Sequence, residues 1–333
     1  VAAALATQAH RLIFYSAAAR LPVRDEAARA LVSFAGADMA SVFFCNSGAE
    51  ANENALKAAV KLTGRNRFVA FAGAFHGRTL LALSVTDSPA LKKGMEPLLA
   101  PVTFLPFGDA TALAAADFSG VAAVIVEPIQ SMAGVTTASP PWFAALRRKC
   151  DQAGALLIFD EVQTGVGRLG QPFAAQFYRV APDMITLAKG MASGVPMAAV
   201  LMSTAVAARL QPADLGSTFG GGPLACAALI ATLRVIQQEG LMARVRALSA
   251  HIRDALADSF IREVRGEGLL LGLVAGEHAA ALKSFLQQHK HILVGGSSDP
   301  GVLRLMPPLN VEAESVEKLL DAVGEFGNRL RAA

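Results

Sequence analysis

The stretch LLIFDEVQTGVGRLGQPFAAQFYRVAPDMITLAKG, residues 156–190, contains two short apolar runs that each lead into ionisable residues. Leu156–Phe159 is followed directly by Asp160, and Met184–Leu187 is followed one residue later by Lys189. Short apolar runs separated by a turn-rich connection are typical of strands buried in a parallel sheet. Ligands bind at the carboxyl ends of such strands, so both ionisable residues are expected at a functional edge of the sheet.

Similar apolar runs occur on both sides of this stretch, and helical patterns separate them. The further strands expected here are Ser41–Cys45, Phe68–Phe71, Val121–Val126 and Ala198–Met202, and the expected helices include Glu50–Leu62 and Pro141–Ala153. Strands that alternate with helices predict an α/β fold with a large, mostly parallel sheet covered by helices.

Beyond about residue 235 the pattern changes to that of a smaller α+β domain. The expected elements are a charged helix over 237–260, a strand pair within Glu263–Val274, a helix over Ala279–His289, a strand at Val302–Leu305 and a closing helix over Glu312–Leu330. We therefore expect a large α/β domain over residues 1–235 and a small C-terminal α+β domain over residues 236–333.

Composition limits the classes of protein to consider. The chain has 333 residues, of which 53% are hydrophobic and 17% charged, with a formal net charge of +3. Disordered chains and coiled coils carry far more charge, so a folded chain with a large core is expected. The charges are scattered, which gives no support for binding nucleic acid or a membrane surface.

The cysteines and the apolar stretches bear on the cellular compartment. Cys45, Cys150 and Cys226 lie far apart, so we expect neither a disulfide framework nor a metal site, and a cytoplasmic, reducing environment. Two charge-free stretches, 190–208 and 215–233, contain glycines and prolines and are expected to be strand and loop inside a core. No secretory signal is visible, and we expect an N-terminal segment to be missing.

Three ionisable residues follow predicted strands: Glu127, Asp160 and Lys189. A parallel sheet would bring them to one edge. A lysine is costly to desolvate, so at this place it is a candidate for a lowered pKa or for a covalent bond to a carbonyl group. The alternative is that Lys189 simply leaves the sheet into solvent.

Ser47 and Gly48 lie between the first predicted strand and its helix. A turn at a helix N-terminus presents free backbone N–H groups and the positive end of the helix dipole, which together form a site for an anion such as phosphate. An ordinary N-cap by Asn46 or Ser47, with Glu50 completing a capping box, is the alternative.

One cofactor needs all of these groups together. Pyridoxal 5′-phosphate requires an amine, an anion site and a carboxylate that keeps its ring nitrogen protonated. Lys189 would be the amine and Asp160 the carboxylate, with Val162 on the same face of the strand able to pack against the ring.

Two competing motifs are weaker. Gly165–Gly170 matches G-x-G-x-x-G, but three residues separate it from the preceding Asp160-Glu161 pair, whereas a dinucleotide fingerprint occupies the first tight turn. Glu127 and Asp160 could instead form a glycosidase carboxylate pair, which leaves Lys189 unexplained.

Seven segments resemble the class III aminotransferases in order and spacing, and most of all those that act on acetylornithine and succinylornithine. They are FFCNSGAEANENALKAA (43–59), FHGRTL (75–80), VEPIQ (126–130), LLIFDEVQTGVGRLG (156–170), PDMITLAKG (182–190), STFGGGPLACAA (217–228) and VLRLMPPLN (302–310).

The resemblance implies an aspartate-aminotransferase-like fold, fold type I of the pyridoxal-phosphate enzymes, with the cofactor in the large domain and active sites shared across a homodimer. It implies ping-pong transfer of the ω-amino group of N-acetylornithine to 2-oxoglutarate, giving the semialdehyde and glutamate, as in arginine biosynthesis. Ornithine, succinylornithine, 4-aminobutyrate and putrescine remain alternative donors. A non-catalytic relative that keeps the fold is the alternative from another class.

The resemblance also implies roles for individual residues. The lysine matching Lys189 binds the cofactor covalently and moves the substrate proton, and the aspartate matching Asp160 pairs with the ring nitrogen. The other implied cofactor contacts are Ser47, Gly48 and Ala49 at the phosphate, Phe75 stacked on the ring, Gln163 at the ring oxygen and Thr218 at the phosphate of the neighbouring subunit.

For the substrates, Arg304 matches the arginine that grips the α-carboxylate of glutamate and 2-oxoglutarate through a bidentate fork. Glu127 matches the acid that masks this arginine when the other substrate is bound, and Arg78 matches the arginine that holds the distal carboxylate of an ornithine-type donor. The chain departs from the family at Ser131-Met132, where Gly-Glu is frequent, and at Gly222, where Asn is usual.

Overall fold

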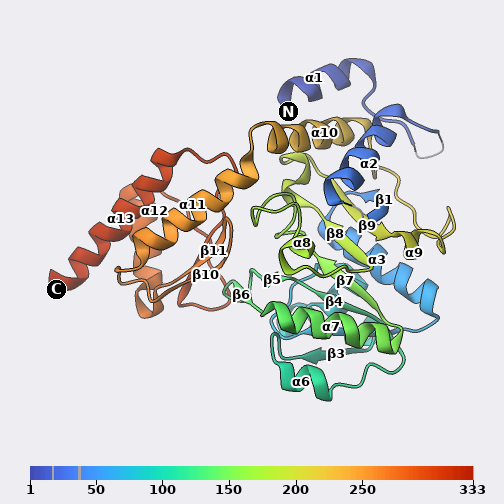
Figure 1. Cartoon of the computed structure of the whole chain (residues 1–333), viewed down its shortest axis with the longest axis horizontal. Coiled ribbons are helices and arrows are strands. Elements are labelled where there is room, and N and C mark those ends of the chain that lie inside the picture. Colours follow the sequence, from blue (N-terminus) through green and yellow to red (C-terminus); the bar gives the residue numbers. More distant parts are fainter. Residues whose placement is uncertain (17–18, 37–38, 333) are drawn as a thin grey trace.

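The protein is described by a computed structural model that covers residues 1–16, 19–36 and 39–332. Figure 1 shows two unequal lobes connected by consecutive helices α10 (Pro223–Gln238) and α11 (Leu241–Leu256). The N-terminal helix α1 (Ala2–Arg11) packs along α10 on the larger lobe.

The larger lobe is built on a seven-stranded sheet in the order β1-β9-β8-β7-β4-β2-β3. All strands run parallel except β9, which is antiparallel to both of its neighbours. The strands are β1 (Met39–Cys45), β2 (Arg67–Phe71), β3 (Val102–Leu105), β4 (Val121–Val126), β7 (Leu156–Asp160), β8 (Met184–Leu187) and β9 (Ala198–Ser203). The prediction of a mostly parallel α/β sheet is confirmed.

Successive side chains of a strand point to opposite faces of the sheet, and both faces are covered here. On β2, Val69 and Phe71 belong to one buried cluster, while Phe68 and Ala70 belong to another. The first cluster includes side chains of α2 (Pro22–Ala35), α7 (Pro140–Ala153) and α10; the second includes those of α3 (Gly48–Thr63), α4 (Leu80–Val85) and α9 (Thr204–Ala207). Strands buried on both faces read as continuous apolar runs, which is why the sequence revealed them.

Short elements connect these layers. They are α5 (Pro89–Lys92), η1 (Glu96–Leu98), α6 (Ala110–Ala115), the hairpin of β5 (Ile129–Gln130) and β6 (Thr136–Thr137), α8 (Ala174–Tyr178) and η2 (Lys189–Ala192). The β5–β6 hairpin contacts the smaller lobe through β10, as Figure 1 also shows.

The smaller lobe has a three-stranded antiparallel sheet in the order β10-β11-β12 and its own buried apolar cluster. Its elements are β10 (Glu263–Glu267), β11 (Leu270–Val274), η3 (Gly276–His278), α12 (Ala279–Lys290), β12 (Val302–Leu305) and α13 (Ala313–Ala332), together with α11. Helix α10 contributes to the core of the larger lobe and α11 to that of the smaller one.

Two expectations for this connection are wrong. The helix expected over 237–260 begins at Leu241, because Gly240 adopts φ 61° and separates it from α10; this left-handed conformation suits glycine. The stretch 215–233, expected to be strand and loop, becomes helical at Pro223. Proline is accepted at the first helical position because its fixed φ matches the helix and no N–H is required there.

No single helix within the described ranges is long and apolar enough to cross a bilayer. Helices α10 and α11 reach the length and apolar composition of a membrane span only when they are taken together, and they are bent by 62° at the break between them. Their apolar side chains belong to the two buried cores.

Candidate active site

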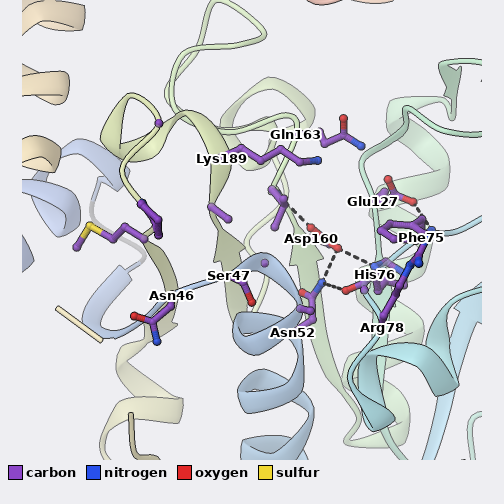
Figure 2. A pocket seen from close by; sticks show the side chains of 18 of the residues that line it. Asn46, Ser47, Asn52, Phe75, His76, Arg78, Glu127, Asp160, Gln163 and Lys189 are labelled. Atoms are coloured by element: carbon purple, nitrogen blue, oxygen red, sulfur yellow. Dashed lines mark hydrogen bonds and ion pairs between the residues drawn. The ribbon is translucent and has the colours of Figure 1, made fainter. Parts of the chain in front are cut away.

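A cavity of about 500 Å³ opens at the carboxyl ends of β1, β4, β7 and β8. Figure 2 shows the side chains that line it. Of the residues predicted for the site, those lining the cavity are Ser47, Gly48, Ala49, Phe75, Arg78, Glu127, Asp160, Val162, Gln163 and Lys189. Two others lie outside it. Thr218 is exposed in the loop before α10, and Arg304 lines a neighbouring cavity of about 570 Å³ in the smaller lobe.

Asp160 is the last residue of β7, and its side chain points to the face covered by α3. The residue is only 5% exposed. Its Oδ2 accepts a hydrogen bond from Nδ2 of Asn52 at 2.7 Å and lies 2.7 Å from Nδ1 of His76, while Oδ1 accepts from the N–H of Val162 at 3.1 Å. Both oxygens are therefore held, and the carboxylate has a fixed orientation toward the cavity (Figure 2).

Asn52 is itself fixed by its neighbours. Its Oδ1 accepts a hydrogen bond from the Thr186 hydroxyl at 2.6 Å, and its Nδ2 also donates to the carbonyl oxygen of His76 at 2.7 Å. The amide thus ties helix α3, strand β8 and the 75–78 loop together around Asp160.

Glu161 points to the opposite face, as strand alternation requires. It accepts hydrogen bonds from the N–H groups of Ala174 at 2.6 Å and Ala175 at 3.0 Å, and from the Thr164 hydroxyl at 3.1 Å. Burial raises its pKa to about 7, and these three donors act against that rise. Glu161 therefore holds the start of α8, whereas its neighbour Asp160 serves the cavity.

Glu127 follows β4 and is 3% exposed. Its Oε1 accepts a hydrogen bond from the N–H of Phe75 at 2.9 Å, which fixes the loop carrying that aromatic ring. Burial raises the pKa of Glu127 to about 7; the nearby Asp160 adds to the rise, and His76, the Phe75 N–H and Lys189 oppose it.

Lys189 lies at the start of η2 with φ 49°, a left-handed conformation that is rare and costly outside glycine. Its amine forms no hydrogen bond or ion pair with the part of the chain that the structure describes. In Figure 2 its side chain extends above Asp160 toward the side of the cavity formed by Glu127 and Phe75.

The surroundings of Lys189 lower the pKa of its amine below that of a free lysine. Desolvation lowers the pKa of the amine, the carboxylates of Asp160 and Glu127 oppose this, and the charge of Arg304 lowers it further. A neutral amine is the form that attacks a carbonyl carbon or accepts a proton.

The turn before α3 has features of both structures considered for it from the sequence, an ordinary N-cap and an anion site. Ser47 caps the helix, since its Oγ accepts a hydrogen bond from the N–H of Glu50 at 3.2 Å. The N–H groups of Gly48 and Ala49 at the cavity have no partner among the described residues. The carboxylate of Glu50 is turned away to the N–H of Asn46 at 2.8 Å and to Ser217. The cap therefore leaves two donors free for an anion.

These groups fit pyridoxal 5′-phosphate. Lys189 supplies an unpaired amine, Gly48 and Ala49 supply free N–H groups for a phosphate, and Asp160 supplies a fixed carboxylate for a ring N–H. Phe75 lines the same cavity, whose volume suits a small aromatic ligand.

The two predicted arginines differ in place but are alike in lacking an acidic partner. Arg78 is an exposed residue that lines the cavity. Arg304 donates from Nε to the Gly296 carbonyl at 2.5 Å and from Nη1 to the Ser131 hydroxyl at 3.0 Å. Within the described ranges no carboxylate lies within 4.0 Å of the guanidinium nitrogens of either arginine. Glu127 influences Arg304 at longer range only, by raising its pKa against the effect of burial.

Asn52 and the contact of His76 with Asp160 were not expected from the sequence. The one signal for Asn52 is that it is a polar residue on an apolar helix face. Ala55 and Ala59 follow it by three and seven residues, which places all three side chains on the same face of α3. For His76, nothing in the spacing indicates Asp160 as the partner.

The sheet-edge cavity, its free amine and its anion site define an enzyme that works with a phosphorylated carbonyl cofactor. Residues 1–326 match the family model described as aminotransferase class III, and the chain belongs to this family. It is a pyridoxal-phosphate-dependent aminotransferase of fold type I.

Similar proteins cover nearly all of the chain. An acetylornithine aminotransferase from Methanopyrus kandleri is 41% identical over 100% of this chain and 85% of its own length. One from Streptomyces coelicolor is 46% identical over 85% of this chain and 71% of its own. Among solved structures, an ornithine aminotransferase from Toxoplasma gondii superposes with a TM-score of 0.90 at 31% identity, covering 100% of this chain and 83% of that one.

Proposed function

We propose that the enzyme transfers the ω-amino group of N-acetylornithine to 2-oxoglutarate, giving the semialdehyde and glutamate in two half-reactions. The observation that carries this proposal is the pair of arginines for which the described residues provide no acidic partner, Arg78 in the cavity and Arg304 beside it. Two guanidinium groups that form no ion pair with the described residues suit substrates that carry carboxylates. The names of the relatives from Methanopyrus kandleri and Streptomyces coelicolor support N-acetylornithine as the donor.

Each residue of the cavity has a separate task in this proposal. When bound, pyridoxal phosphate supplies a carbonyl carbon that accepts an amine and a ring that withdraws electrons from the adjacent carbon. Nζ of Lys189 accepts the proton from the substrate carbon and returns it on the other side of the transferred nitrogen. Asp160 holds the proton on the ring nitrogen, while Gly48 and Ala49 bind the phosphate through their N–H groups, beside Ser47.

The remaining cavity residues orient the ligand. Glu127 fixes Phe75, which together with Val162 packs against the ring, and the amide of Gln163 binds the ring oxygen. Arg78 binds the donor carboxylate and Arg304 the α-carboxylate of 2-oxoglutarate. The masking of Arg304 by Glu127 stays a prediction, since the two side chains form no ion pair here.

We further propose that a second copy of the chain completes the site. Thr218 is exposed, and next to it Phe219 is 63% exposed with its ring 4.9 Å from that of Phe14, which is 40% exposed. Exposed aromatic clusters of this kind mark interfaces. A homodimer would cover the cluster and bring Thr218 to the partner's phosphate site. Light scattering of the wild type and of Phe219→Asp tests this, with a dimer expected for the first and monomers for the second.

The division into a cofactor-binding domain of residues 1–235 and a small domain of residues 236–333 is part of the same proposal. The separate apolar cores of the two lobes support it. The three cysteines are free and buried, which supports a reducing, cytoplasmic location.

The visible absorption of the protein with pyridoxal phosphate tests the function directly. N-acetylornithine should discharge the band of the lysine-bound cofactor, and 2-oxoglutarate should restore it. The same measurement ranks the alternative donors, which are ornithine, succinylornithine, 4-aminobutyrate and putrescine. Lys189→Ala should show no such band and no turnover, while a wild type whose band no donor discharges would favour the non-catalytic alternative.

Arg78 separates the donor classes. Arg78→Ala should lower kcat/KM for N-acetylornithine about 10-fold to 100-fold, because a charge-assisted hydrogen bond to the substrate carboxylate is lost. It should leave kcat/KM for putrescine unchanged, because putrescine has no carboxylate. Unchanged N-acetylornithine kinetics in this variant would contradict the proposed binding pose.

A further inference from the structure

Among the residues that the structure describes, the groups that hold Arg304 are uncharged. A guanidinium has five N–H donors. One, on Nε, is used by the Gly296 carbonyl and another, on Nη1, by the Ser131 hydroxyl, so three remain free among the residues that the structure describes. Glu127, the carboxylate whose charge influences Arg304, accepts a hydrogen bond from the N–H of Phe75 instead.

Ser131 is rigidly placed for this contact. It follows β5 in the β5–β6 hairpin and is fully buried. Its Oγ also lies 3.7 Å from Sδ of Met306, which lines the same cavity as Arg304. The next residue is tied to the smaller lobe as well: the carbonyl of Met132 accepts hydrogen bonds from the N–H and the hydroxyl of Ser298, at 2.8 and 2.9 Å. The hairpin of the larger lobe thus meets β12 at Ser131 and Arg304.

We propose that Ser131 is a positioning residue that determines carboxylate specificity through Arg304. Its hydroxyl fixes one edge of the guanidinium by a neutral contact and leaves the other N–H groups, with the full positive charge, for a substrate carboxylate. A dicarboxylic 2-oxo acid then binds without first breaking an internal ion pair. This inference rests on the proposed function, because it assigns Arg304 to the substrate.

Two substitutions separate this role from simple packing. Ser131→Ala removes the hydroxyl and lets the guanidinium turn, while Ser131→Asp places a carboxylate where the hydroxyl now contacts Nη1. Ser298→Ala is the matched control, because it removes a hydroxyl that holds the same hairpin but does not contact Arg304.

Kinetics give the first measurement. Ser131→Ala should raise the KM for 2-oxoglutarate about 3-fold to 10-fold with kcat nearly unchanged, as expected for one hydrogen bond. Ser131→Asp should raise it by about 30-fold or more, because the new carboxylate competes for the same N–H groups. The discharge of the cofactor by putrescine should stay the same in both variants, and Ser298→Ala should behave like the wild type.

Binding of glutarate, an unreactive dicarboxylate, gives a second measurement that needs no turnover. Titration calorimetry of the cofactor-loaded protein should show the same order of affinities, with wild type and Ser298→Ala tightest and Ser131→Asp weakest. Equal glutarate affinity in wild type, Ser131→Ala and Ser131→Asp would overturn the inference, and so would an equal loss in Ser298→Ala. If glutarate follows the expected order but no donor discharges the cofactor, the proposed donor is wrong while the role of Ser131 stands.

Discussion

Nδ1 of His76 lies 2.7 Å from Oδ2 of Asp160, and both side chains are buried. The other ring nitrogen of His76, Nε2, is buried without a hydrogen-bond partner in the described structure. All the polar bonding of this imidazole side chain is therefore directed to Asp160. A buried nitrogen without a partner is normally costly, so the presence of histidine at this place points to a task at the carboxylate.

His76→Phe tests this relationship. The ring keeps its volume while Asp160 loses one of its two side-chain partners, Asn52 being the other. We expect kcat to fall roughly 10-fold to 100-fold, the effect of one hydrogen bond to a charged group. His76→Asn, which can offer an N–H at a similar place, should recover part of the loss. The absorption spectrum of the bound cofactor should change with kcat; a spectrum and rate unchanged in His76→Phe would contradict the assigned role.

The neighbouring carboxylates Asp160 and Glu161 should respond differently to loss of charge. Asp160→Asn removes the charge that would hold the proton on the ring nitrogen, so we expect kcat to fall by about 100-fold or more with the protein still folded. Glu161→Gln places an amide N–H against the N–H groups that start α8. It should cost about 1 to 3 kcal/mol of unfolding free energy, with little change in the rate per folded enzyme. Thermal unfolding and active-site titration distinguish the two results.

Much of this arrangement can be read from the sequence because β4, β7 and β8 are buried on both faces and Glu127, Asp160 and Lys189 lie at or just after their carboxyl ends. The edge strand β3 was not expected: it has only four residues, Thr103 interrupts its apolar side chains, and Pro101 and Pro106 flank it. The contacts of Asn52, His76 and Ser131 join segments far apart in the chain. Such pairings depend on tertiary packing and have no periodic signal.

The pH dependence of cofactor attachment should follow the charges around Lys189. Its amine must be neutral to react, so the rate of attachment rises as the pH passes through its lowered pKa. Glu127 stabilises the ammonium form, so Glu127→Gln should move the midpoint to lower pH. Arg304 destabilises that form, so Arg304→Gln should move the midpoint to higher pH. Stopped-flow absorption at a series of pH values measures both shifts. Arg179→Gln, at an exposed position away from this cavity, is the control, and shifts in the same direction for the two site variants would refute the assignment.

Close approach of two backbones makes Gly77 the most demanding position beside the cofactor site. Its φ is 129°, and a Cβ atom there would lie 2.5 Å from Cβ and 2.8 Å from Cα of Ala49, one of the two residues with free N–H groups. Gly77→Ala should therefore push the 75–78 loop away from the start of α3. We expect a loss of about 2 to 3 kcal/mol in unfolding free energy and weaker binding of pyridoxal phosphate.

Gly94→Ala provides the matched control for this prediction, because Gly94 also has a positive φ, 82°, but nothing lies within 4 Å of the added Cβ. It should lose only the cost of the backbone conformation, about 1 kcal/mol, and bind the cofactor normally. Thermal unfolding without cofactor and equilibrium titration with it give the two quantities. Equal losses of stability in both variants would mean that backbone conformation alone, rather than contact with Ala49, makes glycine necessary at position 77. Unchanged cofactor affinity in Gly77→Ala would show that the spacing between the loop and the helix does not control the phosphate site.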